Sequence, residues 1–158
     1  MRSPNPIPNG FHSVTPFLTV KDAASAIEWY KKAFGAVEGC ILRDRRGVIA
    51  YGEVRIGDSF VILRDEDPLS GARGPQAGGG SPVTLHLYTE DAEALFERAC
   101  AAEAVVQTPL EENEFHGDLS GSIQDPFGYI WTIAQRVEDI TDEALRARWQ
   151  QIASRMNV

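Results

Sequence analysis

The sequence is short of cysteine, of long apolar runs and of basic residues, and each shortage excludes a class of protein. Only two cysteines occur, Cys40 and Cys100, with no CxxC pair. We therefore expect neither a disulfide framework nor a zinc knuckle, and we interpret both thiols as buried. No apolar run approaches the roughly 20 residues of a membrane span. The first residues, MRSPNPIPNG, contain no apolar stretch and do not resemble a secretory signal, so we expect a cytoplasmic protein.

Acidic residues outnumber basic ones: the chain has 15 Lys and Arg and 23 Asp and Glu, which gives a formal net charge of -8. Such a charge repels a phosphate backbone, so nucleic acid is not an expected partner, and neither is a membrane. The sequence also contains no GxSxG, Walker loop, HExxH, or GxGxxG after a strand. The motifs of the common hydrolases and nucleotide-binding proteins are therefore absent. What remains is a chain of 158 residues, 43% hydrophobic, long enough for a single domain over 1–158.

The first half of the chain, about residues 11–64, predicts a strand, a helix and three further strands. Residues 1–10 form an arm, and 13–20 alternate like a strand. Asp22 is a candidate helix N-cap, and Gly35 a candidate helix end. Three apolar runs follow, which we interpret as antiparallel strands at 36–42, 48–55 and 59–63.

The second half repeats this order after a glycine-rich segment, 65–81, which we interpret as a linker or mobile loop. Residues 82–137 predict a strand at 83–88, a helix capped by Asp91, and strands at 105–110, 119–124 and 129–134. A shift of 69 residues aligns eight identities between positions 14 and 37 and their counterparts, among them Asp22 with Asp91. This indicates a tandem duplication.

A last helix is predicted over 141–156, with Thr141 as its N-cap. It carries one apolar stripe that must pack against something, formed by Leu145, Trp149, Ile152 and Met156. The predicted fold class is thus α+β, with two tandem βαβββ units forming a cup-shaped mixed sheet, plus this C-terminal helix.

Two stretches, LTVKDAASAIEWYKKAFGA and GSIQDPFGYIWTIA, resemble the vicinal oxygen chelate superfamily of glyoxalases, bleomycin-resistance proteins and extradiol dioxygenases. The resemblance covers about residues 11–140. The phrases YKKAFGA, RIGDSFVIL and DPFGYIWTIAQRVEDIT look most like the PhnB-like branch. This resemblance implies that each unit curls its sheet into half of a cup around a small-molecule cavity, and that two chains form a homodimer.

The resemblance also implies where a divalent metal would be held. It places two ligands in the first strands, at Thr15 and Thr84, and two in the last strands, at Val61 and Thr132. Hydroxyl and hydrocarbon side chains are poor ligands for Zn, Ni or Fe, so we expect neither a metal nor another cofactor. The alternative is a relocated metal site, with three candidate catalytic or ligating residues that can equally have ordinary structural roles: His86, Glu53 and His116.

Alternation along the strands predicts which side chains line the cup if the implied ligand positions point inward. The expected lining comprises Thr15, Phe17, Thr19, Tyr51, Glu53, Thr84, His86, Tyr88, Ile130, Thr132 and Ala134, with His116 as a further candidate ligand contact. The neighbouring residues should pack against the helices: Val14, Leu18, Val20, Val83, Leu85 and Leu87. Aromatic rings mixed with hydroxyls suit a small-molecule pocket, although a filled core is the alternative.

Three functions stay open on the sequence alone. The first is a glyoxalase- or bleomycin-resistance-like protein that binds a small molecule in its cup without the usual metal. The second is a lyase, isomerase or dioxygenase-type enzyme with the relocated metal site. The third is a degenerate member with a packed interior that acts through protein association.

Overall fold

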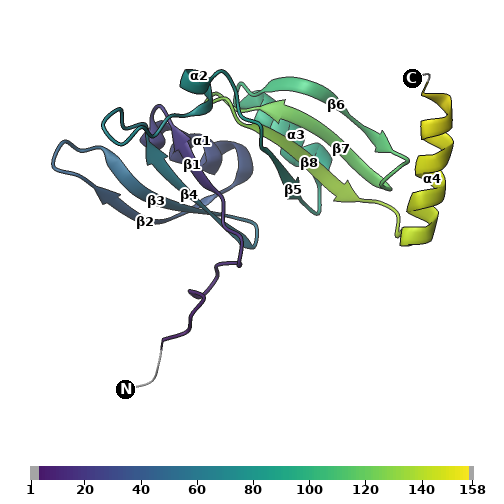
Figure 1. The fold of residues 1–158 in the computed structure, drawn as a ribbon, viewed down its shortest axis with the longest axis horizontal. Helices are drawn as coiled ribbons and strands as arrows, with labels where there is room; N and C mark the ends of the chain where they lie inside the picture. The colour runs from purple at the N-terminus through teal and green to yellow at the C-terminus, as the bar shows by residue number, and fades with distance from the viewer. Residues whose placement is uncertain (1–3, 157–158) are drawn as a thin grey trace.

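The computed structural model describes residues 4–156, which form two units of the same βαβββ order and a C-terminal helix (Figure 1). The first unit contains β1 (Phe17–Val20), α1 (Ala23–Phe34), β2 (Val37–Arg43), β3 (Ile49–Ile56) and β4 (Ser59–Asp65). A short helix, α2 (Pro75–Gly78), connects it to the second unit, which contains β5 (Thr84–Tyr88), α3 (Ala92–Ala101), β6 (Val105–Asn113), β7 (Asp118–Gln124) and β8 (Ile130–Arg136). Helix α4 (Asp142–Arg155) follows. The predicted α+β class is confirmed.

Each unit has one four-stranded mixed sheet, and the two sheets have the same topology. The strand order is β1-β4-β3-β2 in the first and β5-β8-β7-β6 in the second. In both, the first strand runs parallel to the last strand, and the remaining pairs are antiparallel. The pair Leu18 and Leu63 in one sheet corresponds to Leu87 and Ile133 in the other, as a duplication predicts.

The helices begin where the sequence predicts, because both N-caps are made by aspartate. Asp22 accepts a hydrogen bond from the Ser25 amide at 2.9 Å, and Asp91 accepts one from the Ala94 amide at 2.9 Å. Helix α1 ends at Gly35, whose φ of 66° is a conformation that glycine adopts without strain.

The two units share one hydrophobic core, which lies where α1 and α3 pack against each other and against the sheets. Polar contacts also cross between the units. The Trp29 indole donates to the Ala102 carbonyl at 2.6 Å, and the Tyr30 hydroxyl donates to Asp125 Oδ2 at 2.7 Å. Because the helix-covered faces of both sheets meet in this core, the opposite faces point away from it.

Strand β1 is shorter than predicted, since it begins at Phe17 and not near residue 13. Pro16 has no N–H to donate to a ladder, and the Thr15 hydroxyl instead donates to the His12 carbonyl at 3.0 Å. Val14, ahead of β1, is 86% exposed, and Val83, ahead of β5, is 57% exposed. The prediction that these two valines pack against the helices is therefore wrong.

For the residues inside the strands, the prediction that they pack against the helices is confirmed. Leu18 and Val20 are buried in the core, and Leu85 and Leu87 pack against it partly buried. The buried faces of β1 and β5 are therefore those that the alternation indicates.

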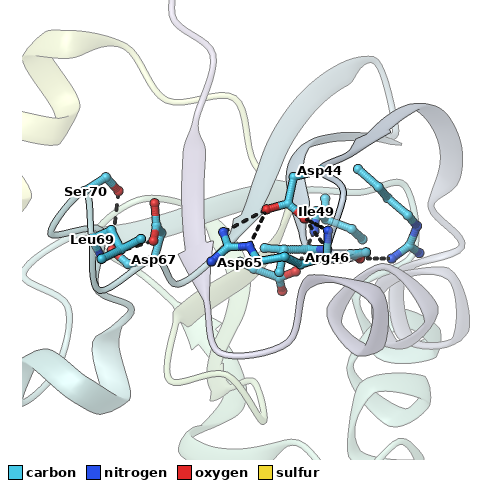
Figure 2. Close-up of polar contacts among 10 residues, drawn as sticks. Asp44, Arg46, Ile49, Asp65, Asp67, Leu69 and Ser70 are labelled. Carbon is cyan, nitrogen blue, oxygen red and sulfur yellow. Dashed lines mark hydrogen bonds and ion pairs between the residues drawn. The ribbon is translucent and has the colours of Figure 1, made fainter.

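The segment 65–81, predicted as a loop, has more structure than its composition suggests. Asp67 and Ala72 form an isolated bridge, α2 follows, and the Gln76 amide donates to the Pro126 carbonyl at 2.8 Å. Figure 2 shows the polar contacts at its start, where the Asp65 carboxylate accepts from the amide of Ile49 at 2.7 Å. The segment is thus tied to both units.

Helix α4 forms where predicted, with the Thr141 hydroxyl accepting from the Ala144 amide at 3.2 Å, but none of its residues is buried. It stands at the outer end of the second sheet (Figure 1). Its Trp149 ring lies 5.2 Å from Phe115, and Arg148 pairs with Glu138 at 2.6 Å. Within the apolar stripe, Trp149 packs on the β6–β7 turn.

The two cysteine side chains are more exposed than predicted. Cys40 is exposed and Cys100 is only partly buried, so the prediction that both thiols are buried is wrong. Within residues 4–156, no helix is both long and apolar enough to cross a membrane.

Candidate functional site

Each sheet has one face covered by a helix and one uncovered face, which we call its cup face. On the first cup face, Phe17 is 51% exposed and its ring meets that of Tyr51 edge-on, with centroids 6.3 Å apart. The Tyr51 hydroxyl donates to Glu53 Oε1 at 2.7 Å. Partial burial and this contact with Glu53 raise the pKa of the Tyr51 hydroxyl to about 12. The structure thus brings together three of the predicted site residues.

Arg64 is a cup-face residue that the sequence analysis missed. Its Nε donates to Thr19 Oγ1 at 3.0 Å, and its guanidinium carbon lies 5.2 Å from the centre of the Phe17 ring. Thr19, predicted to line the cup, is only 8% exposed beside it. The sequence alone did not show this, because placing Val61 on the cup face puts Arg64 on the opposite face, and only the pairing of Ile62 with Phe17 reverses that assignment.

The predicted ligand position at Val61 is wrong by one residue. Val61 is 5% exposed and packs in the core, whereas Ile62 pairs with Phe17 and with Glu53 on the cup face. The position four residues after the turn glycine, Gly57 or Gly128, faces opposite sides in the two units. This is because the β3–β4 hairpin closes with two residues, 57–58, whereas the β7–β8 connection has five, 125–129. In the second unit Thr132 does pair with His86, as Ile62 pairs with Phe17.

The second cup face is more polar. Thr84, His86 and Tyr88 are all exposed on β5, and the rings of His86 and Tyr88 lie 4.7 Å apart. The Tyr88 hydroxyl donates to Asp118 Oδ2 at 3.0 Å. Thr132 adds a hydroxyl beside His86, so this face displays several hydrogen-bonding groups around one imidazole. Ala134, predicted to line the cup, is fully buried instead.

The Asp118 carboxylate, which accepts from Tyr88, is buried beneath the second cup face, since the residue is only 3% exposed. Its other oxygen, Oδ1, lies 2.9 Å from Arg136 Nε but makes no hydrogen bond of good geometry among the described residues. We treat this contact as an ion pair, because the distance is short and the charges are opposite. The ion pair with Arg136 fixes the position of the Asp118 carboxylate, which accepts the hydrogen bond from Tyr88.

Within one chain, the candidates for a relocated metal site are not brought together. Glu53 lies on β3 and His86 on β5, whereas His116 lies in the β6–β7 turn, where its ring contacts Phe115 at 4.3 Å. Over residues 4–156 no group of three or more His, Cys, Asp or Glu side chains could hold a metal ion. Thr15 also lies outside the sheet, in the loop before β1.

The positions that the family resemblance assigns to a metal do not fit one. Thr84 and Thr132 offer hydroxyls on the second cup face, whereas in the first unit Thr15 lies in the loop before β1 and the last-strand position on the cup face is Ile62. Divalent transition metals need imidazole, carboxylate or thiolate donors. Hydroxyls and hydrocarbon do not supply them.

A cleft of about 570 Å³ lies between the β3–β4 hairpin of the first unit and β5 of the second. His86 and Tyr88 border it from β5, and Phe60 and His12 border it from the first unit. The imidazole of His12 lies 3.1 Å from the Asp58 carbonyl. The cleft therefore adjoins the second cup face, within the size range of small-molecule pockets.

Comparisons with known proteins agree with this architecture. Residues 10–133 match the model of the Glyoxalase/Bleomycin resistance protein/Dioxygenase superfamily. The uncharacterized protein Rv0887c of Mycobacterium tuberculosis is 39% identical over 138 residues, which cover 85% of this chain and 81% of that protein. The crystal structure of the Arabidopsis thaliana protein At5g48480 is 31% identical, with a TM-score of 0.62, covering 78% of this chain and 98% of that one.

The chain therefore belongs to the Glyoxalase/Bleomycin resistance protein/Dioxygenase superfamily, the vicinal oxygen chelate proteins. The PhnB protein from Bacillus cereus fits with a TM-score of 0.61 at 16% identity, over 78% of this chain and 99% of that one. Other solved structures of similar fold fit about as well, so PhnB-like proteins are one group of neighbours among several.

Proposed function

We propose that this protein binds a small organic molecule in a cup, without the divalent metal that its superfamily commonly uses. The observation that carries the proposal is the exposure of aromatic rings on the cup faces, 51% for Phe17 and 55% for Tyr88. Exposed rings beside fixed hydrogen-bonding groups are typical of ligand sites, because a ligand that covers them gains apolar burial and directional contacts together.

The cup is proposed to form between two copies of the chain. Within one chain the two cup faces point away from the shared helical core, so neither covers the other. A second copy can supply the missing half, with the first cup face of one protomer opposite the second cup face of its partner. Such a homodimer is two-fold symmetric and makes two equal cups.

The donor set at the positions that would hold a metal supports binding without one. The four positions that would hold a metal carry hydroxyl or hydrocarbon groups, and the carboxylate of Glu53 already accepts hydrogen bonds from Tyr51 and from the Cys40 amide. Binding is proposed to depend on ring contacts and on hydrogen bonds to the cup faces.

The test combines metal analysis with thermal melting of untagged protein. We expect less than a tenth of an equivalent of bound metal, and no rise in melting temperature with Ni, Zn, Mn or Fe. We also expect melting to rise with some members of a panel of small aromatic acids, amines and amino acids, in wild type more than in Phe17→Ala. Near-stoichiometric metal with a clear thermal shift would favour the metalloenzyme hypothesis. Melting that no panel member raises would favour action through protein association.

A further inference from the structure

The first cup face carries one positive and one negative side chain at neighbouring positions that do not pair with each other. Glu53 lies opposite Ile62 in the β3–β4 ladder, and Arg64 is two residues further along β4 on the same face. Diagonal neighbours of this kind lie roughly 7–8 Å apart at their backbones, within reach of long side chains. Among the described residues, however, no salt bridge joins Arg64 to Glu53.

Each charge is drawn away from the other by its own neighbours. Arg64 leans toward β1, where it contacts Thr19 and the Phe17 ring. Glu53 accepts from the Cys40 amide of β2 at 3.2 Å and from the Tyr51 hydroxyl of its own strand, β3. The apolar side chain of Ile62 lies at the position between them.

Both charges keep unused hydrogen-bonding capacity. The only side-chain hydrogen bond of Arg64 among the described residues uses Nε, so both terminal nitrogens are available in the geometry that a carboxylate takes in a paired contact. Glu53 accepts one hydrogen bond at each oxygen, and a carboxylate has about four acceptor sites.

We propose that this face selects an aromatic zwitterion, a small molecule with a ring, a carboxylate and an ammonium group, of the kind that aromatic amino acids exemplify. The inference rests on the proposed function. The ligand carboxylate binds the terminal nitrogens of Arg64, its ammonium binds Glu53, and its ring lies over Ile62 against Phe17. The ligand thereby gives Arg64 and Glu53 each an oppositely charged partner, which neither has within the described part of the chain.

Three molecules with the same indole ring test the proposal, by calorimetric titration of the full chain: L-tryptophan has both charges, 3-indolepropionate only the carboxylate, and tryptamine only the ammonium. We expect L-tryptophan to bind at least tenfold more tightly than the other two. Arg64→Gln should reduce L-tryptophan to the affinity of tryptamine, and Glu53→Gln should reduce it to that of 3-indolepropionate.

Arg146→Gln and Glu97→Gln serve as controls, since they make the same charge changes at exposed positions of α4 and α3. They should leave all three affinities unchanged, and the melting temperature of every variant shows whether it is folded. Equal binding of the three indoles, weakened by Phe17→Ala, would overturn the zwitterion proposal while leaving the small-molecule function in place. Failure of all three to bind at millimolar concentration would also overturn it, and the melting panel would then decide the broader function separately.

Discussion

Asp125 is a buried carboxylate that accepts four hydrogen bonds, three from its own unit and one, from Tyr30, from the other unit. Its Oδ1 accepts from the amides of Phe127 and Tyr129, each at 2.9 Å. Its Oδ2 accepts from the Tyr30 hydroxyl at 2.7 Å and the Trp131 indole at 2.9 Å. Since the residue is 3% exposed, water cannot replace these acceptors, and the carboxylate holds α1 against the β7–β8 connection.

Asp125→Asn should therefore destabilise the fold. One oxygen becomes an amide NH₂, which faces two donors and accepts from neither, and leaving two buried donors unpaired costs about 2–4 kcal/mol. Urea unfolding measures the loss. Asp139→Asn, at an exposed residue, is the control and should cost less than about 0.5 kcal/mol. Equal stability of the two variants would show that the Asp125 contacts contribute little.

The pKa of Asp22 should lie below the ordinary value of 3.8, and the pKa of Asp125 should lie above it. Hydrogen bonds from Ser25 lower the pKa of Asp22, and burial raises the pKa of Asp125 against the effect of its hydrogen bonds. Asp22 then contributes stability that is present above pH 3.8 and is lost as pH falls through its folded pKa. Asp125 contributes stability that is present below pH 3.8 and is lost as pH rises through its folded pKa.

Carboxyl-carbon NMR titration of the folded protein measures both midpoints directly. We expect Asp22 to titrate at lower pH than Asp125. The reverse order would mean that the four hydrogen bonds of Asp125 outweigh its burial.

At the scale of the elements, β6 and β7 approach each other closely at Gly121. A Cβ at this position would lie 2.9 Å from the backbone N and Cα of Leu110, and 2.9 Å from the Phe96 ring. Gly121→Ala should thus destabilise the second unit by about 1–3 kcal/mol through overpacking. Gly78→Ala is the matched control, because a Cβ there meets nothing within 4 Å. Denaturant unfolding of both variants makes the comparison, and a Gly121→Ala variant as stable as wild type would show that the strands separate easily.

Helix α4 should contribute little to the stability of the two units. None of its residues is buried, and its main contacts are the Trp149 ring on Phe115 and the Arg148 contacts with Glu138. We expect removal of residues 141–158 to change the unfolding free energy of the remaining chain by less than about 1 kcal/mol, because exposed ion pairs are weak. Urea unfolding measures this. A larger loss would indicate that a second chain covers the helix.

Helices were easier to predict than strand positions, for reasons visible in particular residues. The caps at Asp22, Asp91 and Thr141 depend on local hydrogen bonds, which the sequence contains completely. The start of β1 depends instead on its pairing with β4, and the face to which Val61 points depends on the length of the β3–β4 hairpin. Neither is a local property of the sequence. Alternation placed Phe17, Tyr51 and Glu53 on one face, but a site residue such as Arg64 reads as an ordinary surface charge until the strands are paired.

At the scale of the whole molecule, the arrangement of the units predicts which chain supplies each half of a cup. In the proposed homodimer, Phe17 of one protomer lies in the same cup as His86 of its partner. Phe17→Ala and His86→Ala should each weaken binding of L-tryptophan in both cups of their own dimers. Both side chains are exposed, so neither change is expected to unfold the protein.

A mixed dimer of the two variants discriminates a shared cup from a cup within one chain. If the cup is shared, one cup receives both substitutions and the other receives neither, so a dimer isolated with two different affinity tags regains one wild-type site. If each cup lies within one chain, every site in the mixed dimer carries one substitution and none recovers. Calorimetric titration with L-tryptophan gives the number of sites, and we expect one full-affinity site per mixed dimer against two in wild type. Sedimentation of the unmodified protein as a monomer at the same concentration would contradict the shared cup directly, because the two cup faces of a single chain point away from the core that joins its units.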